Sequence, residues 1–243
     1  MSPSPRFASS LRSYAIYRSQ RSGVLGYQIL WGGHVSPYKD RRIRHRSLHF
    51  ELYLASRAQA SGICPQDEEP DIVVNHRGWR VGLAAKRINS PQKVATRFSE
   101  AAKQINQTKY PGIICADLSR IVFEKDHAIL VSDYSDLYNL VNLIYYDKLR
   151  PLVNDAIARL PYPEQVLGVL LVTNTVGFDK VHNCPIDNMM RYCVLPENMC
   201  QKQKRRVSAL IRCFYREDGS LSSDRTDKSL DHRYSETIQS PFG

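Results

Sequence analysis

The chain has 243 residues, of which 34 are Lys or Arg and 24 are Asp or Glu, so its formal net charge at pH 7 is +10. Hydrophobic residues make up 42% and aromatic residues 9%, values typical of globular proteins, which exclude a wholly disordered or collagen-like chain. The longest apolar run, residues 166–172, suits a buried strand and is too short to cross a bilayer, so no membrane partner is expected.

The positive charge is concentrated at the two ends of the chain. Residues 1–46 carry nine Lys or Arg and one acid, residues 47–200 carry 16 basic and 17 acidic residues, and residues 201–243 carry nine basic and six acidic residues. We therefore expect a basic, flexible N-terminal arm (1–46), a folded domain (47–215) and a disordered tail (216–243). The arm ends in a run of arginines that either contacts phosphates or is simply solvated: Arg41, Arg42, Arg44 and Arg46.

Helical and strand patterns alternate along the predicted domain. In chain order they are a helix at 48–60, strands at 71–74 and 79–86 joined by a turn at 76–78, a helix at 92–107, a strand at 112–116, a helical stretch at 133–160, a strand at 166–173 and a helix at 201–214. Pro151 should kink or split the long helical stretch. The alternation predicts an α/β domain with a mixed sheet flanked by helices.

The cysteines and the N-terminal sequence indicate the compartment. Six cysteines occur in no disulfide-framework spacing, and no apolar stretch typical of a secretory signal follows the N-terminus. We expect a cytoplasmic protein with reduced, mostly buried thiols, and a Ser/Arg-rich organellar transit peptide is the alternative. A zinc site made by His182, Cys184, Cys193 and Cys200 is less favoured, because their spacing matches no familiar finger.

Five short motifs follow one another between residues 51 and 120. They are Glu51 in the first helix, the pair Pro70-Asp71, the hairpin ending in Lys86-Arg87, the helical segment 100–105 (EAAKQI) and the apolar strand with its continuation at 112–120. In this order they resemble the PD-(D/E)XK, or restriction-endonuclease-like, nuclease superfamily, over about a third of the chain. The resemblance implies an αββαβ core and metal-dependent hydrolysis of DNA phosphodiesters.

The resemblance also implies roles for individual residues. Asp71 matches the principal metal-binding acid, and Glu51 matches a helical glutamate that completes the site for Mg²⁺ or Mn²⁺. Lys86 matches the catalytic lysine that positions or activates water, and Gln104 matches a glutamine beside the phosphate. Arg87, with the arginines of the arm, is then expected to bind nucleic acid.

One position departs from the superfamily pattern. An Asp or Glu should precede the lysine by two residues, and this chain has Ala84 there. In one account the acid has migrated to Glu100, which shares a helical stripe with Arg97 and Gln104. In the other account the catalytic site is lost, and the fold serves as a nucleic-acid-binding or protein-interaction module.

Simpler structural roles remain open for the same residues. Asp71 could cap a turn, and Glu100 could pair with Arg97 on the helix surface. Tyr134, Tyr138, Tyr145 and Tyr146 have the spacing of core or interface residues, and the basic run 202–206 is either a backbone contact or a solvated helix face. A protein partner, including a second copy of the chain, is the third hypothesis.

Overall fold

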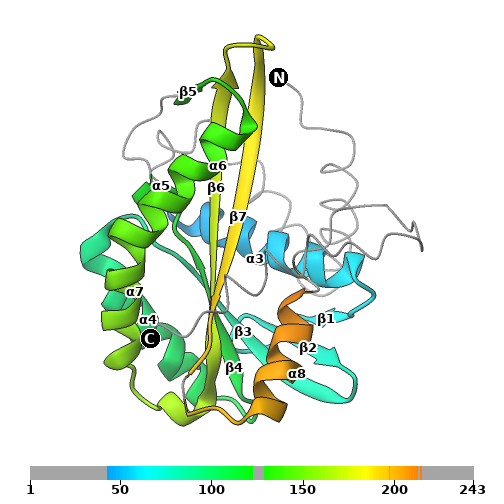
Figure 1. Cartoon of the computed structure of the whole chain (residues 1–243). Coiled ribbons are helices and arrows are strands. Elements are labelled where there is room, and N and C mark those ends of the chain that lie inside the picture. The colour runs from blue at the N-terminus through cyan, green and yellow to red at the C-terminus, as the bar shows by residue number, and fades with distance from the viewer. Residues whose placement is uncertain (1–42, 123–128, 197, 213, 215–243) are drawn as a thin grey trace.

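The computed structural model describes residues 43–122, 129–196, 198–212 and 214. Figure 1 shows a twisted sheet at the centre with helices on both faces. Among the described residues the sheet has seven strands: β1 (Pro65–Gln66), β2 (Ile72–His76), β3 (Trp79–Arg87), β4 (Gly112–Asp117), β5 (Ile129–Val131), β6 (Val166–Asp179) and β7 (Cys184–Val194). Their order is β1-β2-β3-β4-β6-β5, and β7 pairs with β6.

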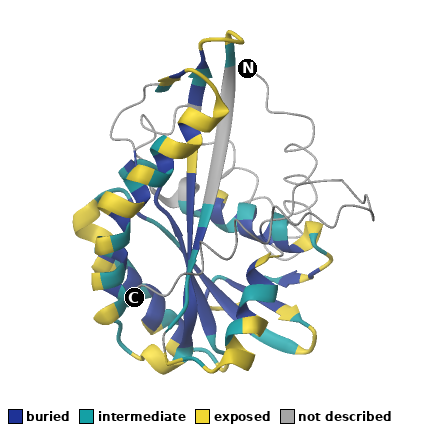
Figure 2. Ribbon diagram, viewed as in Figure 1, coloured by how far each residue is buried: buried dark blue, intermediate teal, exposed yellow. Residues whose placement is uncertain are grey.

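Two groups of helices bury the two faces of this sheet. The helices are α3 (Ile43–Ala60), α4 (Val94–Asn106), α5 (Ser119–Val122), α6 (Tyr134–Ile144), α7 (Arg150–Ala158) and α8 (Gln201–Arg212), with a π-helical turn η2 (Tyr145–Leu149) and short 3₁₀ turns η1 (Pro91–Lys93) and η3 (Pro163–Gln165). Helices α4, α6 and α7 pack on one face, whereas α3 and α8 pack on the other. Figure 2 shows the result: a buried sheet between helices whose outer faces are exposed.

The β2–β3 hairpin is closed by a two-residue turn. Arg77 and Gly78 both have left-handed backbone angles, with φ of 53° and 73°, as a type I′ turn requires. The turn fixes an antiparallel register from His76–Trp79 to Ile72–Leu83. The residue before β2, Asp71, is therefore held at the same sheet edge as the end of β3.

Parallel pairing brings two further strands to that edge. Strand β4 runs parallel to β3, and β6 runs parallel to β4, so the carboxyl ends of all three lie on one side of the sheet. In this register Lys86 lies opposite Ala116, and Arg87 opposite Asp117. Polar and charged residues at the ends of β3 and β4 are thus neighbours in space although they are far apart in the chain.

The predicted α/β class and mixed sheet are confirmed, and each predicted element has a counterpart. The long stretch at 133–160 is divided into α6, η2 and α7, and Pro151 lies in the first turn of α7, directly after the π-helical turn. Sequence patterns missed β7 and the second half of β6, which form one long antiparallel ribbon, and the short elements β1, β5 and α5.

The described part of the chain begins with a helix that overlaps the last residues of the predicted N-terminal arm (1–46). Helix α3 begins at Ile43, so the backbones of Arg44 and Arg46 belong to this helix. Their side chains, together with Arg41, Arg42 and the predicted tail at 216–243, lie outside the described part of the chain. No helix within the described residues is long and apolar enough to span a bilayer.

Substitution of Gly82 by alanine tests the contact that positions the start of β2. A Cβ atom at Gly82 would lie 2.6 Å from Cδ of Pro70, a rigid ring that cannot turn aside. Gly82→Ala should lower the free energy of unfolding by about 1–3 kcal/mol, measured by urea denaturation. The control Asn75→Ala, at an exposed strand position, should change it by no more than about 0.5 kcal/mol. Equal stability of Gly82→Ala and wild type would contradict this account.

Candidate active site

A pocket of about 490 Å³ opens at the sheet edge where β2 begins and β3 ends. Helix α3 forms one wall and helix α4 the other. The lining residues are Ser47, Glu51, Asp71, Ala85, Lys86, Arg87, Arg97, Glu100, Lys103, Gln104 and Gln107. The structure therefore brings together, around one pocket, Glu51, Asp71, Lys86, Glu100 and Gln104, which are the five residues that the sequence assigned to catalysis and metal binding.

Asp71 and Lys86 form an ion pair at the floor of the pocket. The backbone pairing of β2 with β3 ends at Ile72. The next residue outward, Asp71, accepts a hydrogen bond of 2.7 Å through its carboxylate from the backbone N–H of Ala85. The same oxygen lies 3.3 Å from Nζ of Lys86. Only 18% of the Asp71 side chain and 14% of the Lys86 side chain is exposed. The pair is thus fixed by the hairpin and largely removed from water.

Burial and charge act on Asp71 in opposite directions. Burial disfavours the ionised carboxylate, whereas Lys86 and the Ala85 N–H favour it. Burial dominates, so the pKa of Asp71 lies above its ordinary value of 3.8. An incoming cation would stabilise the ionised form further.

Helix α4 supplies the other polar wall of the pocket. Glu100 accepts a 2.6 Å hydrogen bond from Arg97, one turn earlier, as the simpler structural interpretation expected. Gln104 donates through Nε2 to the carbonyl of Pro70 at 3.5 Å. Its Oε1 is buried and has no hydrogen-bond partner among the described residues. This unpaired acceptor is suited to a donor from a ligand or a water.

Ala84 lies inside the core, beside the pocket. It is fully buried in the cluster that contains Phe98 and Ala101 of α4. A carboxylate at this position would replace a methyl group packed among apolar side chains. The apolar packing around Ala84 therefore suits an alanine at this position better than the acid of the superfamily pattern.

The pocket offers the right kind of metal donors in an incomplete arrangement. The carboxylates of Glu51, Asp71 and Glu100 are oxygen ligands of the kind that Mg²⁺ prefers. Among the described residues, however, no three Asp, Glu, His or Cys side chains lie close enough together to hold an ion. The donor chemistry fits a divalent metal, but a preformed three-ligand cluster is not present in the described part.

The alternative zinc site is wrong. Cys184 and Cys193 lie at opposite ends of β7, about 30 Å apart at 3.3 Å per residue. The expectation of buried thiols holds for Cys115, whereas Cys64 and Cys200 are exposed. Cys213 lies outside the described residues.

Asp117 is a polar residue of this edge that the sequence analysis did not single out. Its Oδ2 lies 3.2 Å from the guanidinium of Arg87, and its Oδ1 accepts hydrogen bonds from both the backbone N–H and the hydroxyl of Ser119. The Ser119 hydroxyl in turn accepts from the backbone N–H of Asn174 in β6. Arg87, which the sequence analysis expected to bind nucleic acid, thus forms a salt bridge with Asp117. In the sequence, only the position of Asp117 directly after a predicted buried strand pointed to this residue.

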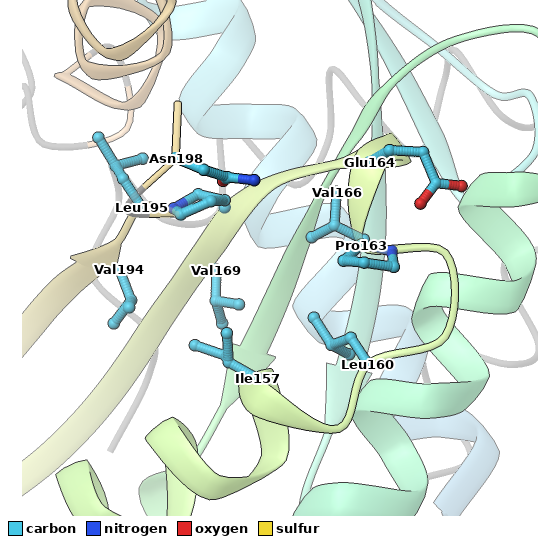
Figure 3. Close-up of a pocket in the computed structure, with 11 residues that line it drawn as sticks. Ile157, Leu160, Pro163, Glu164, Val166, Val169, Val194, Leu195 and Asn198 are labelled. Atoms are coloured by element: carbon cyan, nitrogen blue, oxygen red, sulfur yellow. The ribbon is translucent and has the colours of Figure 1, made fainter. Parts of the chain in front are cut away.

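A second pocket has a different character. It measures about 170 Å³ and lies near the first residues of β6, at the opposite edge of the sheet. Figure 3 shows aliphatic side chains facing one another there, among them Ile157, Leu160 and Val169. Among the described residues that line it, Glu164 is the only charged one.

The raised pKa of Asp71 predicts how its contribution to stability changes with pH. A carboxyl whose pKa is higher in the folded state binds more protons there than in the unfolded chain, so its contribution falls as pH rises from about 3.8 through the folded-state pKa. The free energy of unfolding of wild type minus that of Asp71→Asn should therefore decrease between pH 4 and 7 in urea titrations. A difference that increases over this range would show that Lys86 outweighs burial.

No protein-family model, curated protein or solved structure matches this chain. The interpretation of the pocket consequently depends on its own residues and their geometry.

Proposed function

We propose that the pocket binds a DNA phosphodiester and hydrolyses it with the help of a divalent metal ion. The observation that carries this proposal is the convergence of residues from three separate segments, between Glu51 and Gln104, on one pocket. These are the residues, in the same chain order, that the resemblance to PD-(D/E)XK nucleases assigns to the reaction. The αββαβ order of the core, here extended by the two-residue strand β1, agrees with that resemblance.

The charges of the pocket suit a phosphate. Four cationic side chains line it: Lys86, Arg87, Arg97 and Lys103. Three of them already have carboxylate partners, namely Asp71, Asp117 and Glu100. Lys103 is exposed on α4 and has no salt bridge to a described acid. Cations held in place by carboxylates can stabilise a developing phosphate charge with little rearrangement.

Each residue then has a defined task. Lys86, fixed by Asp71, stabilises the negative charge that develops on the phosphate oxygens, and Oε1 of Gln104 accepts a hydrogen bond from the attacking water. A divalent ion held by Asp71 with Glu51 or Glu100 would polarise the phosphate and acidify that water. Because the three acids do not form a ready cluster, binding of the ion requires Glu100 or Glu51 to turn toward Asp71.

A non-catalytic nucleic-acid-binding module is the second candidate. Two observations favour it: Ala84 is buried where the superfamily pattern has an acid, and the described residues form no three-ligand metal cluster. In that case the same cations would bind phosphate without cleaving it. The two candidates differ in a single measurable property, metal-dependent strand cleavage.

Substitutions of the ion pair test catalysis directly. Asp71→Asn and Lys86→Gln keep side-chain size while removing charge, and each should reduce Mg²⁺- or Mn²⁺-dependent nicking of supercoiled plasmid by about a hundredfold or more. Matched controls are Asp147→Asn and Lys109→Gln, which remove the same charges at exposed positions away from the pocket. Cleavage that persists in both pocket variants would exclude this site. Wild type that binds DNA without cleaving it would establish the second candidate.

Glu100→Gln tests whether α4 supplies the missing acid. If Glu100 is a metal ligand, this variant should need a higher Mg²⁺ concentration for half-maximal cleavage, because one carboxylate of the site is lost. Arg97→Gln provides the comparison, since it removes the partner of Glu100 and should leave the carboxylate available for the metal. An unchanged Mg²⁺ dependence in Glu100→Gln would assign the ligand role to Glu51 instead.

A further inference from the structure

Helix α8 carries the densest positive charge of the described residues. Residues 47–200 contain nearly equal numbers of acids and bases, whereas the 12 residues of α8 contain five Lys or Arg and no acid. The apolar face of α8, formed by Val207, Leu210 and Ile211, is buried against the sheet. The opposite face is therefore left to the basic side chains.

Three of these cations form a compact stripe. Lys202, Arg205 and Arg206 follow a spacing of three and four residues, which places them side by side on a helix, and all three are exposed. They have no salt bridge to any acid among the described residues. A stripe of like charges without ion-pair partners among the described residues is available for an external anion.

The β2–β3 turn extends this stripe. The guanidinium of Arg206 lies 4.5 Å from the ring centroid of Trp79, the first residue of β3, so the tip of the hairpin is joined to α8. Burial, together with the positive charges of Arg77 and Arg206, lowers the pKa of His76. Arg77 is exposed at the turn. We call Arg77, Lys202, Arg205 and Arg206 the α8 surface.

The composition of the α8 surface favours a phosphate backbone over an apolar partner. The large exposed hydrophobic residues of the described chain lie elsewhere, mainly around α6, as Tyr134, Tyr138 and Leu143 do. Among the described residues, none of the large exposed hydrophobic side chains lies on the α8 surface, where one could insert into a membrane or be buried in a protein interface. Three of the four cations are arginines, whose guanidinium groups can bind phosphate oxygens in pairs.

We infer that the α8 surface is a second nucleic-acid contact, which binds the phosphate backbone of duplex DNA outside the catalytic pocket. Six residues separate Asp71 at the pocket from Arg77 at the turn, a distance of about 20 Å along β2. At 3.4 Å per base pair this corresponds to about six base pairs. The surface gives affinity rather than sequence recognition. The inference rests on the proposed function for its partner, DNA, but the α8 surface consists of residues other than those of the pocket.

The test is DNA binding by the full chain in EDTA, so that cleavage does not interfere. Binding of a fluorescent 20-base-pair duplex is measured by anisotropy at several salt concentrations for wild type and for Lys202→Gln/Arg205→Gln/Arg206→Gln. The triple variant should bind roughly ten- to a hundredfold more weakly, and the slope of log K against log salt should fall by about 2 to 3. The control Lys148→Gln/Arg159→Gln/Lys180→Gln, with the same loss of charge at other exposed positions, should bind like wild type.

Two further measurements distinguish loss of DNA binding from loss of folding and from general binding of polyanions. Lys202→Gln/Arg205→Gln retains the Arg206–Trp79 contact and should still reduce the slope by about 2 if the triple variant is unstable. Vesicles containing phosphatidylglycerol serve as the competing polyanion. Unchanged DNA affinity and slope, an equal loss in the control, or a loss restricted to vesicles would overturn the inference.

Asp71→Asn separates this inference from the proposed function. Normal DNA binding by Asp71→Asn, with cleavage lost, supports both a catalytic pocket and a separate α8 surface. If Asp71→Asn still cleaves while the triple variant fails to bind, the catalytic proposal fails and the α8 surface stands.

Discussion

The two-residue turn at Arg77 and Gly78 is the constraint on which the site depends. It fixes the register of β2 and β3, so that Asp71 reaches the backbone of Ala85 and the ammonium group of Lys86. A slip of one residue would turn every side chain of the hairpin to the opposite face of the sheet. Close packing of Pro70 on Gly82 removes the remaining freedom at this end.

Parallel pairing of β3, β4 and β6 then adds further polar residues to the sheet edge at which the hairpin ends. It brings Asp117 beside Arg87 and links it through Ser119 to the backbone of β6. Helices α3 and α4, on opposite faces of the sheet, contribute the two walls of the pocket. Most charges in the pocket are therefore held in pairs, and a ligand would meet a pre-arranged set of cations and carboxylates.

Charge is distributed differently over the pocket and over helix α8. The pocket has acids and bases in near balance, which suits a site that must hold both a metal ion and a phosphate. Helix α8, in contrast, presents cations alone and lies at the other end of the hairpin. The net charge of +10 thus says little about the pocket itself.

Local patterns in the sequence were sufficient for the longer helices, the hairpin and the opposition of Asp71 and Lys86, because periodicity and turn chemistry act over a few residues. The same patterns grouped Glu100 and Gln104 on one stripe of α4. They could not predict the long β6–β7 ribbon or the partner of Arg87, because both depend on pairing between distant strands. Only the tertiary structure shows that Ala84 is packed into the core and that Arg206 covers Trp79, since burial and stacking arise when elements far apart in the chain come together.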